Sequence, residues 1–187
     1  MPSENLTDLL RAVGIVQEGD PVLLEAARPF VFPAELEEAS RVVRELTAAA
    51  DRVAAVYDFA KGMGIAAPQI GEGRAAAIVR PPGLGPLVLL NPVVLEKSTE
   101  TDEQFEGCLS FFDVRGLVPR ALALRVAYDT LEGVRCVSVF ERGLARLVAH
   151  EVDHLAGTLY RATMRPGVDP IPVREYRGSG AAWSYEA

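Results

Sequence analysis

The sequence contains few of the residues that form cross-links or bind metals. It has two cysteines, two histidines and one tryptophan among 187 residues. Two cysteines cannot form the disulfide framework of a small secreted domain, so a reducing cytoplasm is the expected location. Two histidines also limit any metal site to two imidazole ligands, and further ligands must come from other residue types.

Long apolar runs and an excess of positive charge are also missing. No apolar run reaches the roughly 20 residues that a membrane-spanning helix needs. The first 14 residues, MPSENLTDLLRAVG, lack a basic region followed by an apolar stretch, so no secretory signal is expected. The 19 basic and 26 acidic residues give a net charge of −7, which argues against a specific nucleic-acid surface. These absences favour a cytoplasmic protein that binds neither membrane nor nucleic acid.

The length and composition suit one globular domain. A chain of 187 residues with 49% hydrophobic residues can build its own core. No internal repeat or linker divides it. We therefore predict a single domain over residues 1–165, followed over residues 166–187 by an extended tail rich in proline and glycine.

Hydrophobic periodicity predicts two helices with short strands between them. Apolar residues recur at helical spacing over 34–60 and over 144–156. Glycines and a proline over 62–71 predict an irregular loop after the first helix. Runs rich in β-forming residues predict strands at 75–80, 87–91, 93–97, 122–128 and 134–140. This order predicts an α+β fold with mostly antiparallel sheets.

Both histidines lie in the second predicted helix, in the run His150-Glu151-Val152-Asp153-His154. A spacing of four residues places the two imidazoles one above the other on one helix face. Glu151 lies beside that face, within reach of a water held between the rings. This HExxH pattern is typical of hydrolytic metal sites, where two histidines bind the ion and the glutamate carries the proton.

A catalytic site of this kind needs a third protein ligand. The longer HExxHxxGxxH pattern would place a histidine where the sequence has Tyr160. Glu175 lies in the tail beyond the helix, a poor platform for a rigid ligand. The remaining candidates are Cys108, next to Gly107, and Cys136, in a strand-like run where a buried thiol is ordinary. A Cys-His-His set suits Zn²⁺, Fe²⁺, Co²⁺ or Ni²⁺ better than Mg²⁺ or Ca²⁺.

Three segments resemble, in order and separation, the signature motifs of the peptide deformylases. They are GMGIAAPQ at 62–69, EGCLS at 106–110 and HEVDHL at 150–155. Weaker similarities are GDPVL at 19–23, NP at 91–92 and VPR at 118–120. The resemblance covers about residues 15–160, and the three motifs together are highly specific.

The resemblance implies a hydrolase that removes the formyl group from the N-terminal formylmethionine of newly made bacterial polypeptides. It implies antiparallel sheets around a central HExxH helix, with one long N-terminal helix, in a catalytic domain over 1–165. By motif position, Cys108, His150 and His154 hold one divalent metal and Glu151 is the general acid/base. The family's metal is typically Fe²⁺, with Zn²⁺, Ni²⁺ or Co²⁺ able to replace it. N-formylmethionyl nascent chains as substrates also imply a transient contact with the ribosome.

Formamide hydrolysis also requires donors for the oxyanion that develops during attack. The side-chain amide of Gln69 and the backbone N–H of Leu109 are the candidates. Gly64 would let an extended substrate approach the backbone. Met63 and Ile65 are candidates for the pocket that receives the methionine side chain.

The roles of the two arginines that follow the second motif are less clearly indicated by the sequence. Arg115 and Arg120 could each hold Glu106 or a substrate carbonyl, with a solvated surface pair as the alternative. We include Arg115 among the substrate-binding candidates.

Several positions depart from the usual deformylase pattern. Ala149 stands where glutamine usually precedes the first histidine, and Phe112 occupies a region where proline is common. The run RATM at 161–164 stands where an Asp-Arg pair is common, and Ile65 replaces leucine. None is a predicted ligand, so activity is expected, while substrate preference and efficiency stay open. An inactive or altered-specificity paralogue that binds metal or formyl-peptide is one alternative, and an HExxH endopeptidase is another.

Overall fold

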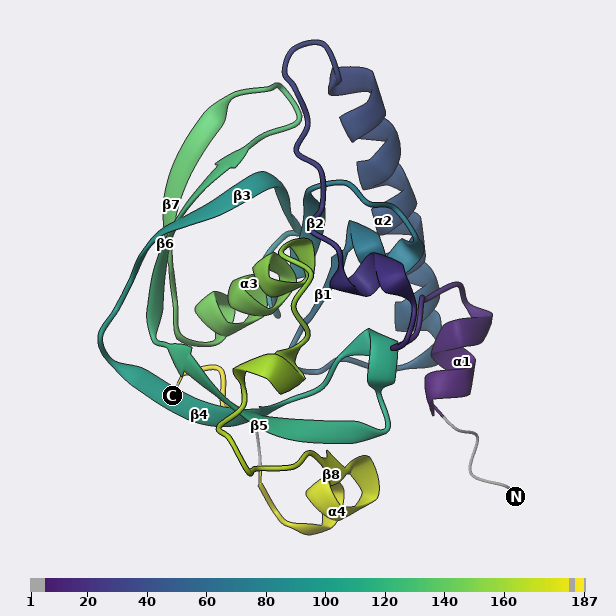
Figure 1. The fold of residues 1–187 in the computed structure, drawn as a ribbon, viewed down its shortest axis with the longest axis vertical. Helices are drawn as coiled ribbons and strands as arrows, with labels where there is room; N and C mark the ends of the chain where they lie inside the picture. The colour runs from purple at the N-terminus through teal and green to yellow at the C-terminus, as the bar shows by residue number, and fades with distance from the viewer. Residues whose placement is uncertain (1–5, 182–183, 187) are drawn as a thin grey trace.

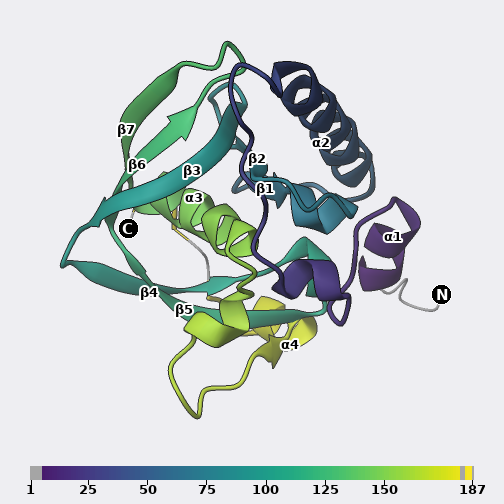
Figure 2. The same ribbon diagram turned by 45° about the horizontal axis from the view of Figure 1, so that its top comes forward.

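The computed structural model describes residues 6–181 and 184–186 (Figure 1). Expectations for residues 1–5, 182–183 and 187, at the two ends of the chain, lie outside the described residues. Within the described part, two antiparallel sheets flank helix α3 (Arg142–Leu155), as Figures 1 and 2 show. The expected α+β class with antiparallel sheets is confirmed. No described helix is long and apolar enough to cross a membrane.

The larger sheet has five strands in the order β1-β2-β3-β6-β7, each antiparallel to its neighbour. These strands are β1 (Met63–Ala66), β2 (Ala76–Arg80), β3 (Leu87–Lys97), β6 (Ala123–Asp129) and β7 (Arg135–Glu141). The smaller sheet has the order β4-β5-β8, with β4 (Thr101–Glu106), β5 (Val114–Ala121) and β8 (Ile171–Pro172). The strands β1 and β7 are therefore the two edges of the larger sheet.

The long helix α2 (Leu36–Val56) supplies most of the main core. Its residues Val42, Leu46 and Val53 are fully buried and pack in the same cluster as Ile65 and Ile78 of the larger sheet. Acidic residues in its first turn suit the positive end of the helix dipole. Helix α3 packs against both sheets, so the side chains on its buried face meet β1 on one side and β5 on the other.

Short helical segments complete the fold. They are α1 (Leu6–Ala12), α4 (Val173–Gly178) and the 3-10 turns η1 (Pro21–Leu24), η2 (Ala67–Ile70), η3 (Leu109–Phe111) and η4 (Tyr160–Thr163). The turn η3 lies in the connection between β4 and β5, and its N-cap residue is Cys108. The β4–β5 connection therefore carries the cysteine toward α3.

Two predicted strands turn out to be one. The runs 87–91 and 93–97 are both part of β3, which continues through Pro92 with one register shift against β6 across Leu90–Val93 and a second between Val94 and Glu96. Asn91 adopts a φ of 47° there, and its side chain donates to Phe30 O and Asp129 Oδ2 at 2.9 and 2.8 Å. A β-bulge accommodates the proline, which lacks an N–H for the ladder.

Two stretches predicted to be irregular are ordered elements. The segment 62–71 contains β1 and η2, because pairing of Met63–Ala66 with β2 overrides its glycine and proline content. The tail beyond 165 is not extended throughout, since β8 pairs with β5 and 173–178 form α4. Tyr176 of α4 packs on Phe105 with ring centroids 5.3 Å apart, a tertiary contact that local composition does not reveal.

Candidate metal centre and active site

The three predicted ligands come together on the inner side of α3. Cys108, His150 and His154 each direct one ligand atom into a common space, and these atoms lie within 4.8 Å of one another. Cys108 Sγ and His154 Nε2 are 3.2 Å apart, a separation that suits two ligands of one ion with bonds of roughly 2.0–2.3 Å. Cys136 lies on β7 and is not part of this cluster. Cys108 is therefore the cysteine that can join the two histidines.

A buried carboxylate orients the first histidine. Glu106, at the end of β4, accepts two hydrogen bonds from Arg120, with Nε at 2.8 Å and Nη2 at 2.9 Å. Its Oε2 also lies 3.0 Å from His150 Nδ1. Burial by itself raises the pKa of Glu106, but Arg120 and His150 outweigh it and hold the pKa well below its usual value. An ionised Glu106 only accepts, so His150 donates from Nδ1 and its Nε2 faces the ligand cluster.

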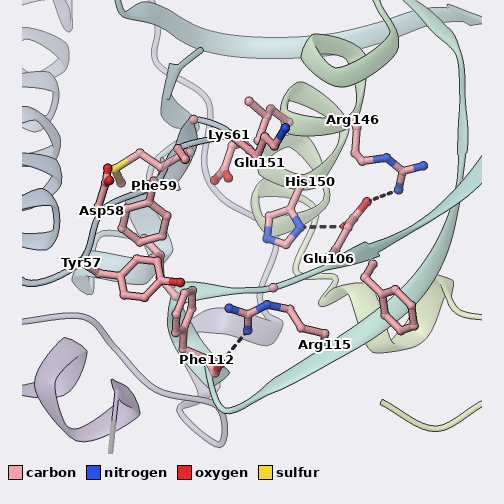
Figure 3. Close-up of a pocket in the computed structure, with 18 of the residues that line it drawn as sticks. Tyr57, Asp58, Phe59, Lys61, Glu106, Phe112, Arg115, Arg146, His150 and Glu151 are labelled. Atoms are coloured by element: carbon pink, nitrogen blue, oxygen red, sulfur yellow. Dashed lines mark hydrogen bonds and ion pairs between the residues drawn. The ribbon is translucent and has the colours of Figure 1, made fainter. Parts of the chain in front are cut away.

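A second arginine holds the same carboxylate, and the sequence did not single it out. Arg146 lies on α3 one turn before His150, and its side chain is 3% exposed. Its Nη1 donates to Glu106 Oε1 at 2.7 Å (Figure 3), and its Nη2 donates to Asp102 Oδ1 at 2.6 Å. An arginine on the buried side of a helix was the only sequence signal for this role. Glu106 is thus fixed between two guanidinium groups.

Glu151 lies next to the ligand cluster and is 2% exposed. Its Oε2 is buried without a hydrogen-bond partner among the described residues. Burial, with smaller contributions from the negative charges of Glu106 and Asp153, raises the pKa of Glu151 to about 7. A carboxyl group with this pKa can both accept and deliver a proton near neutral pH.

Gly64 makes room for that carboxyl group. A Cβ at position 64 would come within 2.7 Å of Glu151 Cγ and closer still to its carboxylate. Gly107 plays a similar part, because a Cβ there would lie 2.7 Å from the guanidinium carbon of Arg115. Gly64 therefore leaves room for the Glu151 side chain, whereas a larger residue at position 107 would require the flexible Arg115 side chain to shift.

The two predicted oxyanion donors lie on the same side of the cluster. Gln69 Oε1 accepts from the Ala66 N–H at 3.0 Å, which turns its Nε2 toward Ser110 Oγ at 3.2 Å and Cys108 Sγ at 3.6 Å. Leu109 is the first residue of η3, so its N–H has no partner within that turn. Both donors border the cavity that opens beside the ligands.

The cavity has a volume of about 290 Å³ and lies between β1, the β4–β5 connection and α3. In Figure 3, His150 and Glu151 face Tyr57, Phe59 and Phe112 across it. The rings of Tyr57 and Phe112 are 5.0 Å apart and form an apolar wall. This space can take an apolar side chain next to the ligand cluster.

Three of the four predicted substrate-binding residues line the cavity. Met63, Gly64 and Arg115 border the cavity. Ile65 is fully buried in the main core and is not among the residues that line the cavity, so its place in the substrate pocket stays a prediction. Met63 and Ile65 share one face of β1 and pack in the same core cluster, and only Met63, at the start of the strand, also reaches the cavity.

The prediction that either arginine could hold Glu106 is resolved in favour of Arg120. Arg115 donates from Nη1 to Phe112 O at 2.7 Å and to Val114 O at 2.8 Å. Burial lowers the pKa of Arg115, and its guanidinium stacks over the Phe112 ring at 4.2 Å. Arg115 is therefore a cavity-wall cation that contacts main-chain carbonyls.

Comparison with known proteins decides the family. The family model described as polypeptide deformylase matches residues 12–168, most of the chain. The chain belongs to the polypeptide deformylase family. Membership identifies it as an enzyme, a hydrolase that removes an N-terminal formyl group from peptides.

The matches with known deformylases span most of this chain and nearly all of each relative. A peptide deformylase of Desulforudis audaxviator is 36% identical over 155 residues, 80% of this chain and 92% of that protein. One of Carboxydothermus hydrogenoformans is 38% identical over 146 residues, 78% of this chain and 89% of that protein. The Met-Ala-Ser-bound class I type b peptide deformylase of Acinetobacter baumannii superposes with a TM-score of 0.69 at 34% identity, over 80% of this chain and 96% of that one.

Proposed function

We propose that Cys108, His150 and His154 hold one divalent metal, Fe²⁺ in the cell, and that Glu151 handles the proton when a formylmethionyl peptide is hydrolysed. The observation that carries the proposal is the unpartnered, buried Oε2 of Glu151 beside the three clustered ligand atoms. A buried carboxyl group without a partner is costly in free energy, and a substrate or water at this place would provide one.

The residues fit a metal of this class. One thiolate and two imidazoles suit Fe²⁺, Zn²⁺, Co²⁺ or Ni²⁺, and the set leaves a ligand position open. When bound, such an ion acts as a Lewis acid and lowers the pKa of a water molecule. Burial, with a smaller contribution from His150, lowers the pKa of His154 well below its ordinary value, which keeps this imidazole neutral for ligation.

We assign the proton and the oxyanion to separate groups. Glu151 accepts the proton of the attacking water and later delivers it to the departing amine. The Gln69 amide and the Leu109 N–H donate to the oxygen that gains negative charge. Gln69 is held in place by Ala66 and Ser110, so its donor is oriented before substrate arrives.

The cavity is assigned to the methionine side chain. Its apolar wall of Tyr57, Phe59 and Phe112 suits a flexible thioether, and Met63 borders the same space. Gly64 leaves the outer edge of β1 close to the cavity, where an extended peptide can pair with it. Arg115 offers its remaining donors to a substrate carbonyl.

The departures from the family pattern do not remove any of these parts. Ala149 lies in the apolar cluster beneath α3, and His150 is held through Glu106 without help from that position. Phe112 supplies part of the cavity wall, so this departure bears on substrate preference. We place the enzyme in the cytoplasm, acting on nascent chains during transient contact with the ribosome.

The test is release of formate from formyl-Met-Ala-Ser by the purified protein loaded anaerobically with Fe²⁺, or with Co²⁺. We expect one formate per peptide and no internal cleavage, with Glu151→Gln as the inactive control. Metal bound at full occupancy without formate would establish the inactive paralogue. Cleavage inside the peptide would establish the endopeptidase.

A further inference from the structure

The outer edge of β7 is regular over Arg135–Glu141, and the C-terminal segment meets this edge only past the strand, where the Gly143 N–H donates to Tyr185 O at 3.0 Å. Within the described residues β7 is the last strand of the larger sheet, and Figures 1 and 2 both show it along a free margin. Its register with β6 runs from Arg135 to Glu141 without a bulge. Val137 and Val139 on this strand are 51% and 62% exposed. Edge strands are normally protected by a bulge, a proline or an inward-facing charge, and β7 has none of these.

The hydrogen-bonding pattern shows which main-chain groups face outward. At the turn of the β6–β7 hairpin, the Thr130 N–H donates to Val134 O at 3.0 Å. At the other end, the Arg142 N–H donates to Leu122 O at 2.6 Å. Hydrogen-bonded pairs alternate along an antiparallel ladder, so the even-numbered residues of β7 bond to β6. The N–H and C=O groups of its odd-numbered residues therefore point to the free edge.

We propose that this edge pairs with β7 of a second copy across a two-fold axis at Ser138. In that antiparallel register Val137 lies opposite the second copy's Val139, and Arg135 lies opposite its Glu141. All four are odd-numbered, so the outward main-chain groups meet as hydrogen-bonded pairs. The sequence RCVSVFE is thus complementary to itself in charge and in shape.

Neighbouring registers match less well. Moving the axis to Val137 would set Arg135 opposite a valine, and moving it to Val139 would set Glu141 opposite a valine. Arg135 is also free to take a second carboxylate. Its contacts with Asp129 at 3.2 Å and Asn91 O at 3.0 Å both use Nη1, which leaves Nε and Nη2 as donors for the second copy's Glu141.

The pairing also continues an apolar row on the outer face of the sheet. Val93, Ala127 and Val137 lie side by side across β3, β6 and β7, and Val93 is 50% exposed. The second copy's Val139 would extend this row by one strand. The substrate cavity lies at β1, the opposite edge, and stays open in such a dimer.

A cysteine at the axis tests the geometry in the full chain. Ser138 would face its own copy as a non-hydrogen-bonded pair with Cα atoms about 4.5 Å apart, within the range of a disulfide. In a Cys136→Ser background, Ser138→Cys should give a covalent dimer on mild oxidation. Glu132→Cys, in the exposed hairpin turn, is the matched control. Cross-linking no faster than that control overturns the proposal.

Charge exchange tests the register without a cross-link. By sedimentation velocity over a concentration series, we expect the wild-type protein to dimerise and Glu141→Arg to weaken dimerisation about tenfold. The double variant Arg135→Glu/Glu141→Arg should restore it, because both facing pairs again have opposite charges. Arg125→Glu, on the same face but one strand inward, should leave it unchanged. A wild-type monomer at every concentration, or no restoration in the double variant, contradicts this register.

Discussion

The two edges of the larger sheet differ in length, burial and surroundings. The β1 edge has four residues, of which Ile65 and Ala66 are fully buried, and Gly64 lies directly against Glu151. The β7 edge has seven residues, and its valines at 137 and 139 are more than half exposed. One edge adjoins the cavity and the ligand cluster, while the other adjoins solvent.

The larger sheet therefore has one edge, β1, that suits catalysis and another, β7, that suits association with a second copy. A short edge with a glycine leaves space for the Glu151 carboxyl group and for an extended peptide. A long regular edge with self-complementary side chains suits a second copy of the chain. Changes near β1 should therefore alter catalysis, and matched changes on β7 should not.

The largest contrast is expected between the two cysteines. Cys108→Ser should lose the metal and with it nearly all activity, because one of three protein ligands is removed. Cys136→Ser changes a half-buried thiol on β7 and should keep full metal content and activity. Metal analysis of both anaerobically purified variants, together with formate release, checks this. Loss of metal from Cys136→Ser would show that the ligand assignment is wrong.

The next largest effect is expected at the proton carrier. Glu151→Gln should retain metal and lower kcat by roughly 10²–10⁴-fold, since general acid/base catalysis contributes that much. Its matched control is Glu141→Gln on the β7 edge, an exposed carboxylate at the opposite side of the sheet. We expect this control to keep the wild-type kcat. A near-wild-type rate in Glu151→Gln would remove Glu151 from the mechanism.

A smaller effect is expected from the second arginine on Glu106. Arg146→Met should weaken metal binding by about 10–100-fold, as loss of support behind a metal ligand commonly does. It should also destabilise the fold by roughly 3–5 kcal/mol, because Glu106 and Asp102 lose a buried partner.

The exposed pair of Arg125 and Glu96, with N and O 3.0 Å apart, provides the comparison for that variant. Arg125→Met should cost no more than about 1 kcal/mol and leave metal affinity unchanged. Metal titration and thermal unfolding measure both variants. Equal behaviour of the two would show that Arg146 has no positioning role.

The ligands could be predicted from sequence because each lies in a short local motif. The spacing of His150 and His154 determines their common helix face, and the glycine beside Cys108 marks a turn. The Arg146–Asp102 contact joins positions 44 residues apart, on α3 and β4, and no local pattern encodes it. The same holds for Ile65, which shares a strand face and the main core with Met63 but does not line the cavity.

The fold was predictable where one face of an element is continuously apolar. The strands β2 and β6 and both long helices carry that pattern. Strand β4 reads TDEQFE, which is mostly polar, and becomes a strand through its pairing with β5. The bulge at Pro92 and the helix α4 likewise depend on partners distant in sequence. Such elements follow from tertiary contacts instead of local preference.

The last prediction concerns the effect of pH on catalysis through the ionisation of Glu151. Burial first, and then the charges of Glu106 and Asp153, raise the pKa of Glu151 to about 7 in the metal-free protein. A bound divalent cation favours the ionised form, so kcat/KM should decline on the acid side of a pKa at or below 7. The decline should approach tenfold per pH unit, because only the carboxylate accepts the proton.

The stability of the metal-free protein should depend on the ionisation of Glu151 in the opposite direction, so that it falls as pH rises. Since the folded pKa lies above the ordinary value of 4.5, the unfolded chain releases this proton first. The contribution of Glu151 to stability is therefore fully present below pH 4.5 and is lost as pH rises toward 7, by about 3 kcal/mol. Thermal unfolding of metal-free wild type and Glu151→Gln, compared at each pH, isolates this term from the opposite trend of Glu106. Parallel stability curves for the two proteins would mean that the buried Glu151 carboxyl group titrates at an ordinary pKa. Burial beside Gly64 would then not bring its pKa close enough to neutral pH for efficient proton transfer.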